Sequence, residues 1–140
     1  MKLFDSLGRY QPQMLGLLRI VTALLFIEHG TQKLFSFPAS AQAGGSLGGL
    51  MLTAGILEVF GGILVALGLL TRPVAFILAG EMAAAYFMGH MPRNFFPVNN
   101  GGDAAVLFCF VFLYLVFAGA GAFALDNRRA NPATNAYSAS

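Results

Sequence analysis

Charged side chains are scarce in this chain. Among its 140 residues there are 8 Lys and Arg and 6 Asp and Glu, which is 10% of the sequence. Soluble domains carry about 25% charged residues, so too few are present to cover a soluble globule of this size. The basic residues are also scattered along the chain without interleaved aromatics. This pattern argues against nucleic acid as a partner.

Cysteine chemistry is equally limited, because Cys109 is the one cysteine of the sequence. A disulfide within the chain and a CxxC redox pair are therefore excluded. Cys109 lies among phenylalanines and valines, which favours a packed thiol over a reactive one. The sequence also has no GxGxxG motif, phosphate-binding loop or haem-attachment motif. An electron carrier used by this protein would be lipid-soluble or belong to a partner.

Long apolar runs dominate what remains, since 57% of the residues are hydrophobic. A membrane-spanning helix needs ~20 mostly apolar residues. Pro73 is well placed to start a helix and Asp103 to cap one. We therefore expect an all-α, multi-pass integral membrane protein that folds as a four-helix bundle. Its predicted spans are 14–35, 47–70, 73–91 and 103–125.

The basic residues predict the orientation, because cytoplasmic loops are enriched in Lys and Arg. We expect both termini in the cytoplasm of a bacterium and the loops 36–46 and 92–102 outside its inner membrane. The sequence then divides into a cytoplasmic segment 1–13, one membrane domain 14–125 and a disordered cytoplasmic tail 126–140. Lys2, Arg9, Arg72, Arg128 and Arg129 lie on the side of the termini, and Lys33 and Arg93 on the other.

Four charged residues interrupt the predicted spans: Arg19, Glu28, Glu58 and Glu81. A charge near the bilayer centre costs about 2.5 to 3.5 kcal/mol on insertion scales. Glu58 and Glu81 are therefore expected to point into the bundle. Arg19 is expected within salt-bridge reach of a carboxylate, either Glu81 or Glu28. A structural role in neutralising these charges and fixing helix register is the alternative to a functional one.

A second polar group is predicted near the outer mouth of the bundle. His29 and Lys33 are four residues apart and share a helix face, and His90 falls at a similar depth. Histidine titrates near neutral pH, which suits proton exchange. Ordinary interfacial solvation is the alternative. The predicted site has Glu58, Glu28 and Glu81 as catalytic carboxylates and His29, Lys33, Arg19 and His90 as ligand-binding residues; no metal is assigned.

Two of the predicted helices carry packing signals. The adjacent glycines Gly61 and Gly62 allow a neighbouring helix to approach closely. The fourth segment is uncharged between residues 104 and 125 and rich in phenylalanine. We expect it to be a packing helix that faces lipid. An apolar wall for a hydrophobic ligand is the alternative.

Five short motifs lie in order along about residues 15–125: Leu18-Arg19, HGTQKL at 29–34, EVFGGIL at 58–64, GLLTRP at 68–73 and GGDAA at 101–105. Together they resemble the DoxX family. The resemblance implies a four-helix inner-membrane protein. The family is named for a membrane subunit linked to thiosulfate:quinone oxidoreduction, and other relatives have roles in stress tolerance or complex assembly.

Two functional hypotheses follow. The first is a quinone-linked oxidoreductase or its membrane subunit, with buried carboxylates as a proton relay and a lipid-soluble quinone as the carrier. The second is a non-enzymatic membrane scaffold or assembly partner of a redox complex. The expected partners are membrane lipids, a quinone, and a redox protein or a second copy of the chain.

Overall fold

Every regular element of the computed structural model is helical over the residues it describes, 2–39 and 48–130. Of these elements, η1 is a 3₁₀ helix and η2 is a π-helix. The elements are α1 (Lys2–Asp5), η1 (Ser6–Tyr10), α2 (Gln11–Phe35), α3 (Gly49–Leu67), α4 (Thr71–Ala85), η2 (Tyr86–His90), α5 (Pro97–Asn100), α6 (Asp103–Ala118) and α7 (Leu125–Ala130).

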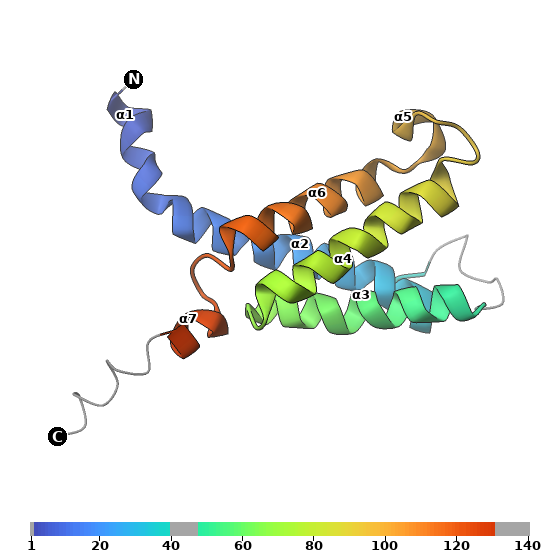
Figure 1. Cartoon of the computed structure of the whole chain (residues 1–140), viewed down its shortest axis with the longest axis horizontal. Helices are drawn as coiled ribbons and strands as arrows, with labels where there is room; N and C mark the ends of the chain where they lie inside the picture. The colour runs from blue at the N-terminus through green and yellow to red at the C-terminus, as the bar shows by residue number, and fades with distance from the viewer. Residues whose placement is uncertain (1, 40–47, 131–140) are drawn as a thin grey trace.

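The four long helices pack mainly as two pairs, α2 with α3 and α4 with α6. The pairs cross, and both termini emerge at the same end of the molecule as the turn between α3 and α4 (Figure 1). We call this the termini end and the opposite end the loop end. Between the pairs, Phe26 of α2 packs edge-on against Phe108 and Phe112 of α6, with ring centroids 5.3 and 4.8 Å apart.

Two helices are long and apolar enough to cross a membrane. The first is the continuous helix Ser6–Phe35, with 30 residues, and the second is α3, with 19. The helix α6 is apolar but has 16 residues, and α4 has 15 before it continues into the five residues of η2. The all-α fold is thus confirmed over the described residues, while the four-helix bundle and the crossing of all four predicted spans stay predictions.

Several helix ends differ from those predicted. The helix α4 begins at Thr71, before Pro73, because its N-terminus is capped from elsewhere in the chain. The helix α6 ends at Ala118 instead of Leu125, since Gly119 adopts a φ of 84°. Asp103 is inside α6, where Gly102 occupies the cap position, so the prediction that Asp103 caps this helix was wrong.

The C-terminal segment is also more ordered than expected. The tail was predicted to be disordered from residue 126, but it begins with the short helix α7. Asp126 of this helix accepts hydrogen bonds from the backbone N–H groups of Leu70 and Thr71, at 2.8 and 2.9 Å. The rest of the predicted tail, 131–140, lies outside the described residues, as does 40–47 in the loop after α2.

The packing signals of the sequence are confirmed. A Cβ atom on Gly61 would lie 2.8 Å from Leu78 of α4, and one on Gly62 would lie 2.6 Å from Ile27 of α2. Adjacent glycines therefore let α3 approach two neighbours at once. The helix α6 buries Phe112 completely and leaves Phe110 and Phe117 65% and 75% exposed, as expected of a packing helix with an outward face.

Candidate functional site

An ion pair joins α2 to α3 near the loop end. Nζ of Lys33 lies 2.5 and 2.6 Å from the two carboxylate oxygens of Glu58. The carboxylate side chain is 2% exposed, whereas the lysine side chain is 26% exposed. The two helices approach closely here because each has a glycine at the crossing. A Cβ atom on Gly30 would lie 2.9 Å from the backbone N of Val59, and one on Gly55 would lie 2.8 Å from Leu34.

A second carboxylate lies beside this pair, on α4. Both carboxylate oxygens of Glu81 are buried and have no hydrogen-bond partner in the described part of the chain. The side chain interacts electrostatically with Glu58 and with Lys33. The predicted inward orientation of Glu58 and of Glu81 is therefore confirmed. We call Lys33, Glu58 and Glu81 the loop-end charge cluster.

His29 lies at the edge of this cluster. Its Nδ1 is 2.9 Å from the carbonyl oxygen of Leu25, so Nδ1 carries a hydrogen and donates it to this carbonyl. The imidazole packs edge-on against Phe108 of α6, with ring centroids 5.5 Å apart. It also interacts electrostatically with Glu58. His29 therefore joins the cluster to the aromatic core.

Other predicted site residues lie elsewhere. Glu28 is exposed, and its carboxylate forms no ion pair within residues 2–39 and 48–130. Arg19 precedes Lys33 by fourteen positions on α2, a distance of about 21 Å along the helix axis. His90 belongs to η2, beyond the end of α4. The structure therefore groups Lys33, Glu58, Glu81 and His29, and separates the remaining three.

The expected salt bridge of Arg19 was wrong. Arg19 is completely buried, and its guanidinium donates to five backbone carbonyl oxygens instead of a carboxylate. The acceptors belong to the end of α3 and to the chain after α6, where carbonyls are left unpaired by the helix ends. The acceptors are Val65, Ala66, Ala120, Ala122 and Phe123, at 2.5 to 3.1 Å.

His90 is part of a separate polar group at the loop end. Its Nδ1 lies 3.1 Å from the carbonyl oxygen of Asn100 and 3.2 Å from Nη2 of Arg93. The ring nitrogen donates in the first contact or accepts in the second, depending on the tautomer. Asn100 is buried, and it donates to the carbonyl oxygen of Asn94 at 2.7 Å. This group fixes the fold of the loop.

The contacts made at Thr71, Arg72 and Asp126 could not be predicted from the sequence. Arg72 donates through Nη1 to the carbonyl oxygens of Val116 and Phe117, at 2.6 and 2.8 Å. It therefore closes the C-terminus of α6, while Asp126 closes the N-terminus of α4. Neither contact has a local sequence signal, because each joins residues more than 40 positions apart.

The chemistry of the loop-end charge cluster is that of hydrogen bonding and proton exchange. Glu81 offers two acceptor oxygens, and Lys33 offers a partly exposed ammonium group. Within the described ranges, no group of three or more His, Cys, Asp or Glu side chains is arranged to hold a metal ion. Together these groups can both donate and accept hydrogen bonds.

The helices and the buried ion pair define an all-helical membrane protein with a polar cluster inside its apolar body. The chain belongs to the DoxX family, whose model matches residues 14–91. It is 31% identical over 143 residues to the inner membrane protein YphA of Escherichia coli, covering 91% of this chain and 98% of that protein.

A second relative is more similar in sequence. The chain is 50% identical over 129 residues to an uncharacterized protein of Haemophilus influenzae, covering 89% of this chain and 96% of that protein. No solved structure matches this chain. The predicted family is therefore confirmed, and the comparisons assign no reaction to it.

Proposed function

We propose that this DoxX protein is the membrane component of a quinone-linked oxidoreduction, and that its loop-end charge cluster binds the quinone head group and exchanges protons with it. The observation that carries the proposal is the carboxyl group of Glu81, with both oxygens buried and unpartnered among the described residues. A buried carboxyl group without a hydrogen-bond partner is best explained in one of two ways: it accepts a hydrogen bond from a ligand, or it takes up a proton.

The neighbouring residues suit such a head group. The reduction of a quinone to a quinol takes up two electrons and two protons. In this proposal the electrons come from the cofactor of a partner redox protein, and the protons pass through Glu81 and Glu58. The ammonium group of Lys33 stabilises negative charge on the quinone oxygen in a water-poor site. The quinol hydroxyl then donates a hydrogen bond to Glu81.

The proposal includes four membrane crossings in a bacterial inner membrane, with both termini in the cytoplasm. Together, α4 and η2 form a helical segment from Thr71 to His90 that is long enough to cross. The helix α6 pairs with the α4 part of this segment. The loop-end charge cluster then lies within the apolar layer, in its outer half.

Binding of a short-chain ubiquinol, whose hydroxyl group can donate to Glu81, to the purified full-length protein tests the proposal. Glu81→Gln removes the ionisable group but keeps the side-chain size. We expect it to weaken ubiquinol binding about tenfold, the loss of one good hydrogen bond from the quinol hydroxyl to a charged group. Glu28→Gln makes the same change on an exposed glutamate and serves as the matched control. Equal affinities for the wild-type and Glu81→Gln proteins would contradict the proposal.

A non-enzymatic scaffold is the second candidate function. The observation in its favour is that Lys33 and Glu58 neutralise each other, while Arg19 is satisfied by backbone carbonyls. These charges then serve only to hold helices together for a redox partner or a second copy of the chain. Under this alternative, Glu81→Gln leaves ubiquinol binding unchanged and alters only thermal stability or recovery of a partner.

A further inference from the structure

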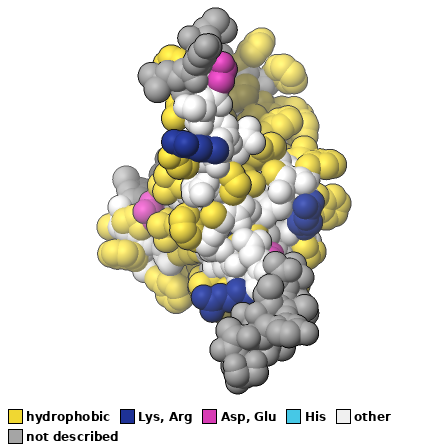
Figure 2. Space-filling model, turned by 90° about the vertical axis from the view of Figure 1, so that its left-hand side faces the viewer, with side chains coloured by type: hydrophobic (Ala, Val, Ile, Leu, Met, Phe, Trp, Pro, Cys, Tyr) yellow, Lys and Arg dark blue, Asp and Glu magenta, His cyan; other side chains and the backbone are white. Residues whose placement is uncertain are grey.

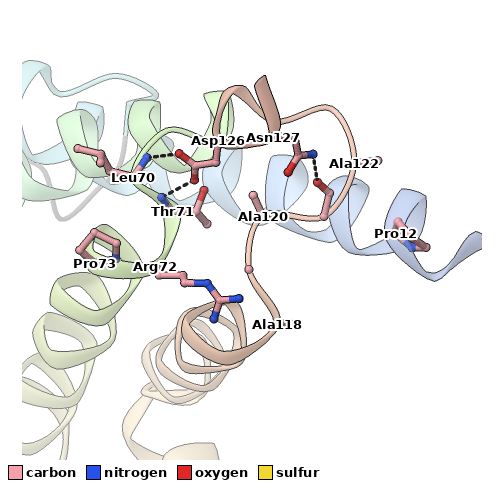
Figure 3. A pocket seen from close by; sticks show the side chains of 12 residues that line it. Pro12, Leu70, Thr71, Arg72, Pro73, Ala118, Ala120, Ala122, Asp126 and Asn127 are labelled. Carbon is pink, nitrogen blue, oxygen red and sulfur yellow. Dashed lines mark hydrogen bonds between the residues drawn. The ribbon is translucent and has the colours of Figure 1, made fainter. Parts of the chain in front are cut away.

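An open pocket of about 810 Å³ lies at the termini end, far from the loop-end charge cluster. It is formed by the N-terminus of α4, the chain after α6 and the start of α7 (Figure 3). The helix α3 ends at Leu67, and Leu70, which lines the pocket, follows three positions later. The pocket therefore lies at the level where a spanning helix meets the lipid head groups.

Arg72 lines this pocket, and part of its guanidinium forms no hydrogen bond within the described residues. A guanidinium has five N–H donors. Nη1 supplies the two bonds to α6, while Nε and Nη2 form no hydrogen bond within the described part of the chain. The edge formed by Nε and Nη2 carries the remaining three N–H groups. Two parallel donors on one edge match a phosphate group in a bidentate pair.

Thr71 supplies an independent sign of a ligand in the same pocket. The residue is 1% exposed, and its hydroxyl oxygen has no hydrogen-bond partner among the described residues. A buried hydroxyl without a partner costs free energy. The pocket is lined by Thr71 and Arg72 together, so a phosphate held by the guanidinium can also accept a hydrogen bond from this hydroxyl.

A carboxylate at the same pocket restricts the ligand further. Asp126 lines the pocket and caps α4 (Figure 3). A purely anionic ligand would be repelled by this carboxylate, whereas a ligand with a phosphate and an amine would be attracted by both charged groups. Figure 2 shows hydrophobic side chains spread over the termini end, with basic side chains in separate patches. Such a surface suits contact with lipid.

We infer that this pocket binds a phosphoethanolamine head group, with its phosphate on the Nε and Nη2 edge of Arg72 and its ammonium group toward Asp126. The source of the head group is a membrane phospholipid, because the pocket opens at the end of the helices that cross the membrane. The inference is independent of the proposed quinone chemistry, which involves the opposite end of the molecule.

Native mass spectrometry of the delipidated full-length protein tests the inference. We expect phosphatidylethanolamine to bind more tightly than phosphatidylcholine, whose quaternary amine cannot donate, and than phosphatidylglycerol, which has no amine. Arg72→Gln should weaken phosphatidylethanolamine binding about tenfold. Arg9→Gln removes the same charge from the same end of the molecule, away from the pocket, and should leave binding unchanged. Equal binding of the three lipids, or an unchanged affinity in Arg72→Gln, would overturn the inference.

A second variant covers the case in which Arg72→Gln does not fold. Thr71→Val keeps the side-chain shape and removes the buried hydroxyl, so the free protein should be as stable as the wild type or more stable. We expect its affinity for phosphatidylethanolamine to fall, and an unchanged affinity would count against the inference. Free phosphoethanolamine distinguishes the source, because stabilisation by this soluble compound equal to that by the lipid would overturn the assignment to a membrane phospholipid.

Discussion

Lys33 reaches both carboxylate oxygens of Glu58, so one ammonium group neutralises a carboxylate that is 2% exposed. Removing one partner of a buried ion pair leaves the other charge uncompensated, while removing both is far less costly. This relationship between α2 and α3 determines what each substitution at the pair should do.

The first prediction is a double-mutant cycle on this pair. Lys33→Met should lower the free energy of unfolding by about 3 kcal/mol, seen as a lower melting temperature in detergent. The double variant Lys33→Met/Glu58→Gln should recover most of that loss, because neither charge of the pair remains. Glu28→Gln should change stability by less than about 0.5 kcal/mol, since Glu28 is exposed. A double variant as unstable as Lys33→Met would argue against the pair.

The second prediction concerns Arg19. Arg19→Lys keeps the charge but provides three donors from one atom, which cannot reach five separate carbonyl oxygens. We expect a loss of about 3 kcal/mol or more from the carbonyls left unpaired in a buried site, together with faster proteolysis after residue 118. Arg72→Lys is the control, since Arg72 is exposed and one nitrogen makes both of its bonds. Full stability of Arg19→Lys would show that charge alone matters.

The sequence predicted the parts of the fold that depend on local chemistry. Apolar run lengths indicated α2 and α3, and the high cost of charge in lipid predicted the inward orientation of Glu58 and Glu81. The partner of Arg19 could not be predicted in this way. Its carbonyl acceptors become available only because α6 breaks at Gly119 and returns to α2, a contact between residues 101 positions apart.

The candidate site was predicted only in part, for a geometric reason. Glu28 and Glu58 were both predicted as site residues because each interrupts a predicted span, but a position along a span does not specify which face a residue occupies. Glu28 proved to be exposed, whereas Lys33 turns toward Glu58. No sequence signal indicated that Nε and Nη2 of Arg72 would be left without a hydrogen bond, since the position of the guanidinium depends on the C-terminus of α6.

The third prediction compares two glycines. Gly30→Ala would place a Cβ atom 2.9 Å from the backbone N of Val59, and only a shift of α2 away from α3 relieves that contact. We expect a loss of about 1 to 3 kcal/mol. A Cβ atom on Gly80 would have no neighbouring heavy atom within 4 Å, so Gly80→Ala should raise stability by up to about 1 kcal/mol through helix propensity. Equal melting temperatures for the two variants would contradict the close crossing.

The fourth prediction concerns the number of membrane crossings. Single cysteines are placed in a Cys109→Ala background at Gly8 in η1, Val98 in α5 and Asn127 in α7, and a membrane-impermeant maleimide is added to intact bacterial cells. If all four long helices cross, the probe at position 98 lies on one side and the probes at 8 and 127 lie on the other. The excess of basic residues at the termini end places position 98 outside, so only this probe should react before permeabilisation.

Labelling also separates four crossings from two. If α2 and α3 alone crossed the membrane, position 98 would lie on the same side as positions 8 and 127, and all three probes would react under the same conditions. Val98 is 78% exposed, so its failure to react in intact cells could not be attributed to burial within the chain. Protection of position 98 until permeabilisation would therefore contradict the predicted orientation. Reaction of position 98 alone would support four crossings and place the loop-end charge cluster in the outer half of the membrane.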